Sequence, residues 1–190
     1  MKEILGNTEG LKNNVIEILT SLYDLKAPPW QLVSEEIALT MAKITTAVNR
    51  EVNIFLDRKG NVLSVSIGDS NTVSLPNLPG RRGSGRLSGI RCVHTHPGGN
   101  PRLSGIDLSA LRAHKYDLMA AIGVNDEKPE ESVLNFAIIT GKDEYGQYTA
   151  EEYGVLKLDV LETLGEAVVD MDSEITDVIE LTENPSKTEE

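Results

Sequence analysis

The sequence predicts a mixed α/β domain in which helices pack on a central sheet. Three observations predict this class. Apolar residues recur at helical spacing through the first fifty residues, and the period changes to two from Glu51 onward. Beyond residue 88, short apolar runs alternate with a further helical pattern. Strands interleaved with helices are typical of a sheet covered by helices.

Two helices are expected before the first strand. The first covers roughly residues 9–26, and Pro28 and Pro29 end it. Ser34 precedes two glutamates and a run of apolar residues, so it is expected to cap a second helix that reaches about Asn49.

A β-hairpin is expected next. Alternating apolar residues at 52–56 and 62–67 flank the turn-forming stretch 57–61. The remaining expected elements are a strand at 72–75, a loop rich in Gly, Pro and Arg at 76–87, a strand at 90–93, a helix at 104–115, strands at 118–124 and 133–140, and an exposed helix at 155–181.

The distribution of charge suggests three parts. Residues 1–150 contain 16 Lys and Arg against 17 Asp and Glu, whereas residues 151–190 contain 2 against 13, which together give the net charge of −12. We therefore divide the chain into a helical segment at 1–50 that packs on the core, a core at 51–150, and an acidic helix and tail at 151–190. An acidic tail of this kind usually serves solvation.

The composition favours a cytoplasmic protein without membrane contact. No apolar run approaches the roughly 20 residues that span a bilayer, and Met1–Gly10 lacks the pattern of a secretion signal. A single cysteine, Cys92, excludes an internal disulfide and fits a reducing compartment. We expect Cys92 to be a small core residue rather than a nucleophile.

Three metal-ligand residues fall within the fourteen residues from His94 to Asp107. If the strand continues into His94, then His94 and His96 point to the same side. Asp107, in the first turn of the following helix, can turn back toward them. Two imidazoles and one carboxylate leave one position open on a zinc ion, which is typical of a catalytic site.

Glu51 and Ser104 are the other candidate catalytic residues. Water activated by zinc needs a carboxylate as proton acceptor, and Glu51 begins the first strand. The alternative is that Glu51 caps the preceding helix or pairs with Arg50. Ser104 stands three residues before Asp107, so it can cap the helix, and its hydroxyl can also stabilise an oxyanion. Both roles are compatible.

The motif His94-x-His96-Pro97, followed by Ser104 and Asp107 and preceded by Glu51, resembles that of the JAMM (MPN-type) metalloproteases. The stretch from Glu51 to Val124 is also similar to bacterial RadC proteins. The resemblance implies a hydrolase with a three-layer α/β/α fold of the cytidine deaminase-like class. It further implies that His94, His96 and Asp107 bind Zn²⁺, that Glu51 is the general acid and base, and that Ser104 stabilises the oxyanion.

A second resemblance concerns the start of the chain. Residues 6–12, Gly-Asn-Thr-Glu-Gly-Leu-Lys, and the helix that follows are similar to the N-terminal region of long HflX-type GTPases. The chain has no Gly-x-x-x-x-Gly-Lys-Ser/Thr phosphate loop. The resemblance therefore implies that the 190 residues of this chain are the N-terminal portion of a ribosome-associated GTP-binding protein and do not themselves bind GTP.

Five arginines flank the proposed metal, and an anionic partner is one interpretation of them. They are Arg81, Arg82, Arg86, Arg91 and Arg102. They would form a basic rim for ribosomal RNA or an acidic peptide, or they belong to a solvated loop. His114, seven residues after Asp107, lies on about the same helix face and is either a distant neighbour of the metal or an ordinary surface histidine.

Two functions from different classes remain open. The first is a zinc-dependent peptidase or isopeptidase. The second is a non-catalytic regulatory or ribosome-binding module of the GTPase. A zinc deaminase is disfavoured because the Pro-Cys-x-x-Cys pair of such enzymes is absent. The substrate and the oligomeric state do not follow from the sequence.

Overall fold

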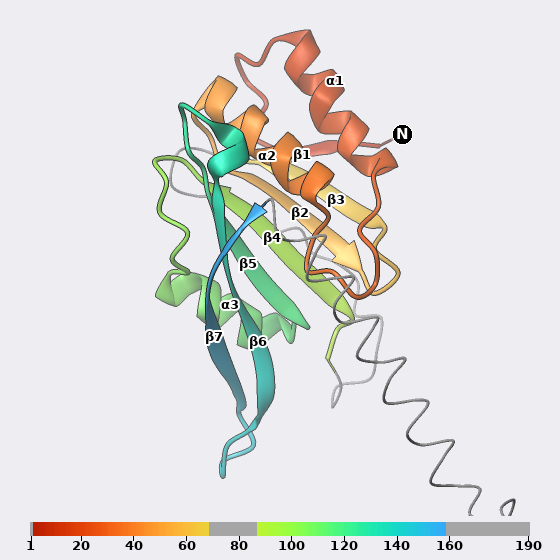
Figure 1. Cartoon of the computed structure of the whole chain (residues 1–190). Coiled ribbons are helices and arrows are strands. Elements are labelled where there is room, and N and C mark those ends of the chain that lie inside the picture. The colour runs from red at the N-terminus through yellow and green to blue at the C-terminus, as the bar shows by residue number, and fades with distance from the viewer. Residues whose placement is uncertain (1, 69–86, 159–190) are drawn as a thin grey trace, which may run out of the picture.

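The computed structural model describes residues 2–68 and 87–158, and the described strands form one seven-stranded mixed sheet (Figure 1). The α-helices are α1 (Asn13–Ser21), α2 (Glu35–Val48) and α3 (Gly105–His114), and the 3-10 helices are η1 (Leu22–Asp24) and η2 (Pro129–Glu131). The strands are β1 (Ile4–Gly6), β2 (Val52–Asp57), β3 (Val62–Ile67), β4 (Ile90–His96), β5 (Leu118–Gly123), β6 (Val133–Lys142) and β7 (Tyr148–Lys157). The predicted α/β class is confirmed.

Strand β4 lies in the middle of the sheet, whose order is β1-β3-β2-β4-β5-β6-β7. It pairs antiparallel with β2 and parallel with β5, so that His94 stands between Asn53 and Ala121. The parallel connection from β4 to β5 contains α3. Strand β2 pairs with β4 as far as His94, and β5 pairs with it as far as His96, so the backbone of both histidines is held in the sheet.

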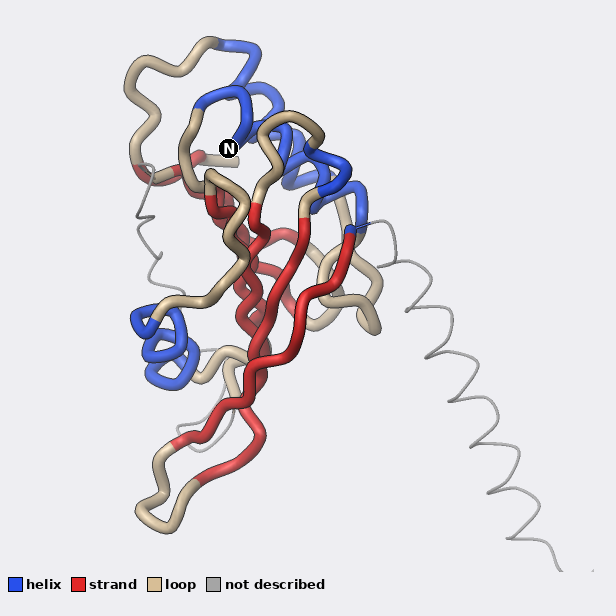
Figure 2. Tube along the Cα trace, turned by 60° about the vertical axis from the view of Figure 1, so that its left-hand side comes forward, coloured by secondary structure: helices blue, strands red, loops and turns tan. Residues whose placement is uncertain are grey.

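Two apolar clusters lie on opposite faces of the sheet. Successive residues of a strand face opposite sides, and Ile54 belongs to one cluster whereas Phe55 belongs to the other. The first cluster includes the buried residues of α1 and α2, and the second includes Leu111 of α3. Figure 2 shows α3 on one side of the strands and the other two α-helices on the other side.

Local sequence signals explain the helices. The Ser34 hydroxyl accepts a hydrogen bond from the Ile37 N–H at 3.3 Å, and Asn49 ends α2 in the left-handed conformation. The predicted second helix is therefore confirmed, and so is the helix that follows Ser104. The first helix is shorter than predicted, since α1 and η1 cover only residues 13–24. No described helix combines the length and the apolarity that a membrane crossing requires.

The predicted helix at 155–181 is wrong at its start, and strand β7 crosses residue 151. Residues 148–157 form β7, which pairs antiparallel with β6. The apolar spacing around Val155 resembles that of a helix, but the free edge of β6 offers backbone partners that decide the conformation. The short strand β1 was not predicted. The expected strand at 72–75 and nearly all of the loop at 76–87 lie outside the described residues, as does everything after Leu158.

Candidate metal centre

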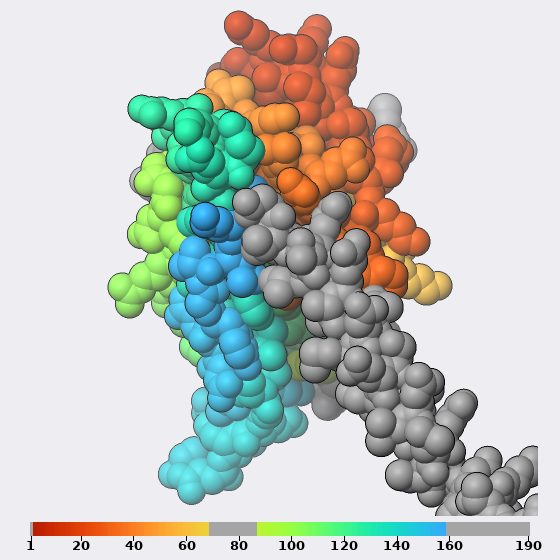
Figure 3. All heavy atoms as spheres, in the orientation of Figure 1, coloured from red at the N-terminus to blue at the C-terminus, as the bar shows by residue number. Residues whose placement is uncertain are grey.

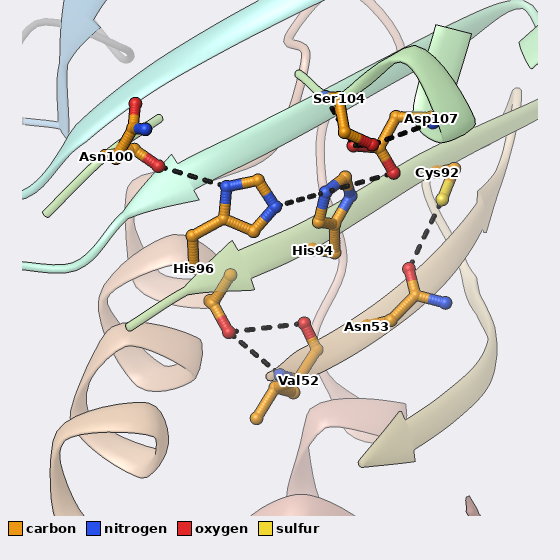
Figure 4. A network of polar contacts seen from close by, with 9 residues as sticks. Val52, Asn53, Cys92, His94, His96, Asn100, Ser104 and Asp107 are labelled. Carbon is orange, nitrogen blue, oxygen red and sulfur yellow. Dashed lines mark hydrogen bonds and ion pairs between the residues drawn. The ribbon is translucent and has the colours of Figure 1, made fainter. Parts of the chain in front are cut away.

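Strand β4 presents two histidines on the face that α3 covers. It continues to His96, three residues beyond its predicted end. Cys92 belongs to the cluster on this face, and strand alternation places His94 and His96 on the same side as Cys92. His94 is only 4% exposed, and its Nε2 atom lies 3.0 Å from Nε2 of His96 (Figure 4). The two imidazoles therefore converge, as the sequence predicted.

Asp107, at the start of α3, faces the histidines from above the sheet. Its Oδ1 atom lies 3.6 Å from Nε2 of His94. Its Oδ2 atom accepts hydrogen bonds from the backbone N–H and the hydroxyl of Ser104, both at 2.7 Å (Figure 4). The Ser104 oxygen in turn accepts from the Asp107 N–H at 3.1 Å. This capping box fixes the carboxylate with one oxygen toward Ser104 and the other toward the histidines.

The geometry fits a tetrahedral metal ion. Ligand atoms of His94, His96 and Asp107 all lie within 4.8 Å of one another. Zinc bonds of about 2.0–2.1 Å at tetrahedral angles separate two ligand atoms by about 3.4 Å. Two of the three separations, 3.0 Å between the histidine Nε2 atoms and 3.6 Å from His94 to Asp107, lie on either side of that value, and the third is at most 4.8 Å. A small adjustment of the side chains would therefore place the three donor atoms around one ion.

The protonation of the histidines also suits metal binding. The pKa of His94 is lowered to about 4, chiefly by burial; the negative charge of Asp107 opposes this shift, and the nearby His96 adds to it. His94 is thus neutral at neutral pH. Nδ1 of His96 lies 3.0 Å from the carbonyl oxygen of Asn100. A carbonyl can only accept, so Nδ1 of His96 donates to it, and Nε2 is the ring nitrogen that faces His94.

Glu51 is buried beside this cluster, with an exposed fraction of 7%. Asn53 pairs with His94, and Glu51 stands two residues before Asn53, so strand alternation places it on the same face as His94. The pKa of the Glu51 carboxyl is raised to about 7, chiefly by burial and also by the negative charge of Asp107. The alternative pairing with Arg50 is not seen, because that guanidinium donates to the Asn7 carbonyl.

The loop after His96 passes directly over the end of β5. A Cβ atom on Gly123 would lie 2.4 Å from the carbonyl oxygen of Gly99 and 2.6 Å from the nitrogen of Pro101, so the approach requires glycine. Beyond this crossing lies a groove of about 460 Å³. It is lined by Gly98, Gly99, Gly123, Val124, Asn125, Asp126, Glu127, Glu131 and Val133.

Sequence reasoning missed the polar residues that anchor this end of β4. The Thr95 hydroxyl accepts a hydrogen bond from the Val52 N–H at 2.8 Å and lies 2.6 Å from the Thr45 hydroxyl. The Cys92 thiol donates to the Asn53 side-chain oxygen at 3.2 Å. Burial raises the pKa of this thiol well above its usual range. Asn53, a polar residue among the apolar residues of β2, was the signal available for the second contact.

The five arginines do not form one rim within the described residues. Arg81, Arg82 and Arg86 lie outside them. Arg91 is buried, and its guanidinium donates to backbone carbonyls, including that of Asp57 at 3.1 Å, so it is not available to an anionic partner.

The other two candidates near the site are exposed. Arg102 is exposed in the loop that precedes Ser104. His114 is also exposed, and its ring stacks on that of Tyr116, with the ring centroids 5.3 Å apart.

Comparisons of the chain with protein-family models, with curated proteins and with solved structures found no match. The assignment of function therefore depends on the residues of the site.

Proposed function

We propose that this chain is a zinc-dependent JAMM-type metallopeptidase or isopeptidase-like domain with a three-layer α/β/α fold. The observation that carries the proposal is the convergence of His94, His96 and Asp107 within 4.8 Å, with Glu51 buried on the same face of the sheet. Two imidazoles and a carboxylate leave one position of a tetrahedral ion open to solvent or substrate. The open metal position supports a hydrolase, and the single cysteine supports a cytoplasmic location.

The reaction would be hydrolysis of an amide bond. A zinc ion held by His94, His96 and Asp107 would supply a Lewis acid that polarises the carbonyl and lowers the pKa of the attacking water. Glu51, with a pKa of about 7, is poised to accept a proton from that water and to return it to the departing amine. The amide C–N bond breaks, and the products are a carboxylic acid and an amine.

Ser104 would act in two ways. Its hydroxyl fixes Asp107, and this bond supports the metal ligand. The same hydroxyl can turn to donate to the oxyanion, because the Ser104 backbone N–H still holds Oδ2 of Asp107. Loss of the hydroxyl should therefore reduce both the affinity for zinc and the rate of hydrolysis.

Elemental analysis of the protein purified without added metal tests the site. We expect about one zinc per chain, with loss of zinc in His94→Ala and Asp107→Asn. His114→Ala is the matched control, because this exposed histidine lies on α3 away from the cluster and should not change the zinc content. A protein that binds no zinc, even when zinc is supplied, would contradict the proposal.

Catalysis is tested separately with Glu51→Gln. This variant should keep its zinc but should no longer hydrolyse a mixed library of peptides and isopeptides. The products are detected by mass spectrometry. Hydrolysis at an unchanged rate would show that Glu51 is not the proton acceptor.

One observation favours a second function, that of a non-catalytic accessory module of an HflX-type GTPase that binds the ribosome. The reciprocal bonds between Ser104 and Asp107 form a capping box, which accounts for both residues without any metal. In that case, deletion of residues 1–190 from the parent GTPase should change its GTP turnover or its affinity for the ribosome. If neither changes, this second function is wrong.

A further inference from the structure

Arg91 lies near the start of β4, at the other end of the strand from His94, and its buried side chain connects two loops by hydrogen bonds. Its Nη1 donates to the carbonyl oxygens of Gln31 and Leu32, and its Nη2 donates to that of Asp57 at 3.1 Å. Arg91 is only 6% exposed. A buried guanidinium needs these acceptors, so the loop at 28–33 and the turn at 57–61 are held in fixed positions next to each other.

Backbone contacts join the same two segments. The Ala27 N–H donates to the Gly60 carbonyl at 3.0 Å, and Lys26 pairs with Asn61 in an isolated bridge. Gly60 has a φ of +82°, and a Cβ atom there would lie 1.5 Å from the Ala27 carbonyl oxygen. Only glycine permits this approach, and the two segments therefore form one rigid unit.

This unit presents an aromatic ring and two cations to solvent. Trp30, the single tryptophan of the chain, is 55% exposed. Lys26 and Lys59 are exposed, and neither has an ion-pair partner among the described residues, whereas Arg58 is paired with Asp117. We call Lys26, Trp30 and Lys59 the Trp30 surface. Figure 3 shows the two segments that carry it next to each other on the exterior.

The one acidic residue of the adjoining turn is occupied within the turn. The Asp57 carboxylate accepts hydrogen bonds from the backbone N–H groups of Lys59 and Asn61, at 2.9 and 3.0 Å. The ammonium groups of the Trp30 surface therefore remain available to an anion. A tryptophan side chain in a protein core typically buries about 150–250 Å² of surface. Trp30 instead exposes its ring from a rigid loop, so the ring can contact a partner.

We propose that the Trp30 surface binds single-stranded nucleic acid. A base would stack on the indole of Trp30, and neighbouring phosphates would contact the ammonium groups of Lys26 and Lys59. Surfaces that bind single strands without sequence preference combine these two elements. An acidic peptide would satisfy the two cations but would leave the indole ring without a stacking partner, so we favour the nucleic acid. The surface lies at the opposite end of β4 from His94, and the inference does not depend on the proposed hydrolase.

Trp30 is also the probe that tests the inference. The full chain is titrated with a short oligouridylate while the tryptophan fluorescence is measured, and stacking should quench the emission in a saturable way. Two phosphate contacts on a single strand predict that log K falls against log salt with a slope of about −1.4. A titration that leaves the emission unchanged would overturn the proposal.

Variants separate the cations from the ring. Lys26→Ser/Lys59→Ser should remove most of the salt dependence, whereas Lys12→Ser/Lys142→Ser removes the same number of exposed lysines elsewhere and should change nothing. Anisotropy of a labelled oligouridylate should show weaker binding to Trp30→Ala by about 5- to 150-fold, the range that stacking of one base provides.

Two further ligands decide the class of partner. An abasic strand of the same length carries the same phosphates without bases, and it should bind weaker than the oligouridylate by a similar factor. An oligoglutamate peptide should bind more weakly still and leave the emission of Trp30 unchanged. If the abasic strand binds as tightly as the oligouridylate, or if the peptide quenches Trp30 equally, the surface is a general anion or protein contact and the proposal is wrong.

Discussion

Replacing Glu51 with glutamine should stabilise the metal-free protein at alkaline pH and not at acidic pH. The pKa of Glu51 is raised from 4.5 to about 7 in the folded state. The folded state therefore binds a proton more tightly than the unfolded state does. The stability that this gives is fully present below pH 4.5 and is lost as the pH rises through about 7. Glutamine stays neutral at every pH and avoids this loss.

The magnitude follows from the shift. Each pKa unit is worth 1.36 kcal/mol, so a shift of about 2.5 units corresponds to at most about 3.4 kcal/mol. The carboxyl lies beside a site that opens to water, and solvent screening reduces this to about 1–2 kcal/mol. For a chain of this size that is about 2–8 °C in the melting temperature.

The assay is thermal unfolding with a chelator at about pH 5 and about pH 8. The comparison is the melting temperature of Glu51→Gln minus that of the parent chain, which should be larger at pH 8. Effects shared by both proteins, such as protonation of buried His94, largely cancel in this difference. Glu17→Gln changes an exposed carboxylate of α1 and is the control. An equal difference at both pH values, or a larger one at pH 5, would refute the assignment of Glu51 as a buried carboxyl with a raised pKa.

Three other substitutions test the scaffold. Arg91→Leu leaves several buried carbonyl groups without a donor and should lower the unfolding free energy by about 3 kcal/mol or more, measured by urea denaturation. Gly123→Ala forces the loop at 99–101 away from β5, so it should cost about 1–3 kcal/mol and weaken zinc binding, measured by competition with a chromophoric chelator. Thr95→Val removes the bonds to Val52 and Thr45 and should cost about 1–3 kcal/mol, whereas the exposed Thr149→Val should cost little. An unchanged stability in any of the first three variants would contradict the contact that it removes.

Local patterns predicted the parts of the molecule that depend on local chemistry. The serine caps at Ser34 and Ser104 act within one helical turn, and both were visible in the sequence. Two histidines separated by one residue in a strand must share a face, and the structure brings them together. These predictions needed only the periods of strand and helix.

Features that depend on distant partners were not predictable in the same way. Strand β7 forms because it pairs with the edge of β6. The spacing of apolar residues around Val155 does not show that this edge is available. The sequence grouped Arg91 with the other arginines of a basic rim. Its position on a buried strand instead directs its guanidinium to the carbonyls of Gln31 and Leu32, about sixty residues earlier in the chain. The burial that raises the pKa of Glu51 likewise depends on the assembled sheet.

The capping box at the start of α3 has a consequence for the rate at which a metal would leave the site. A free aspartate must give up rotamer freedom when it ligates an ion, and it regains that freedom on release. Asp107 is already immobilised by two hydrogen bonds from Ser104, so it gains little by letting go of the ion. The site would therefore exchange its metal slowly, and Ser104→Ala would reveal this as faster loss of zinc to a chelator, even where the equilibrium content at saturating zinc is the same.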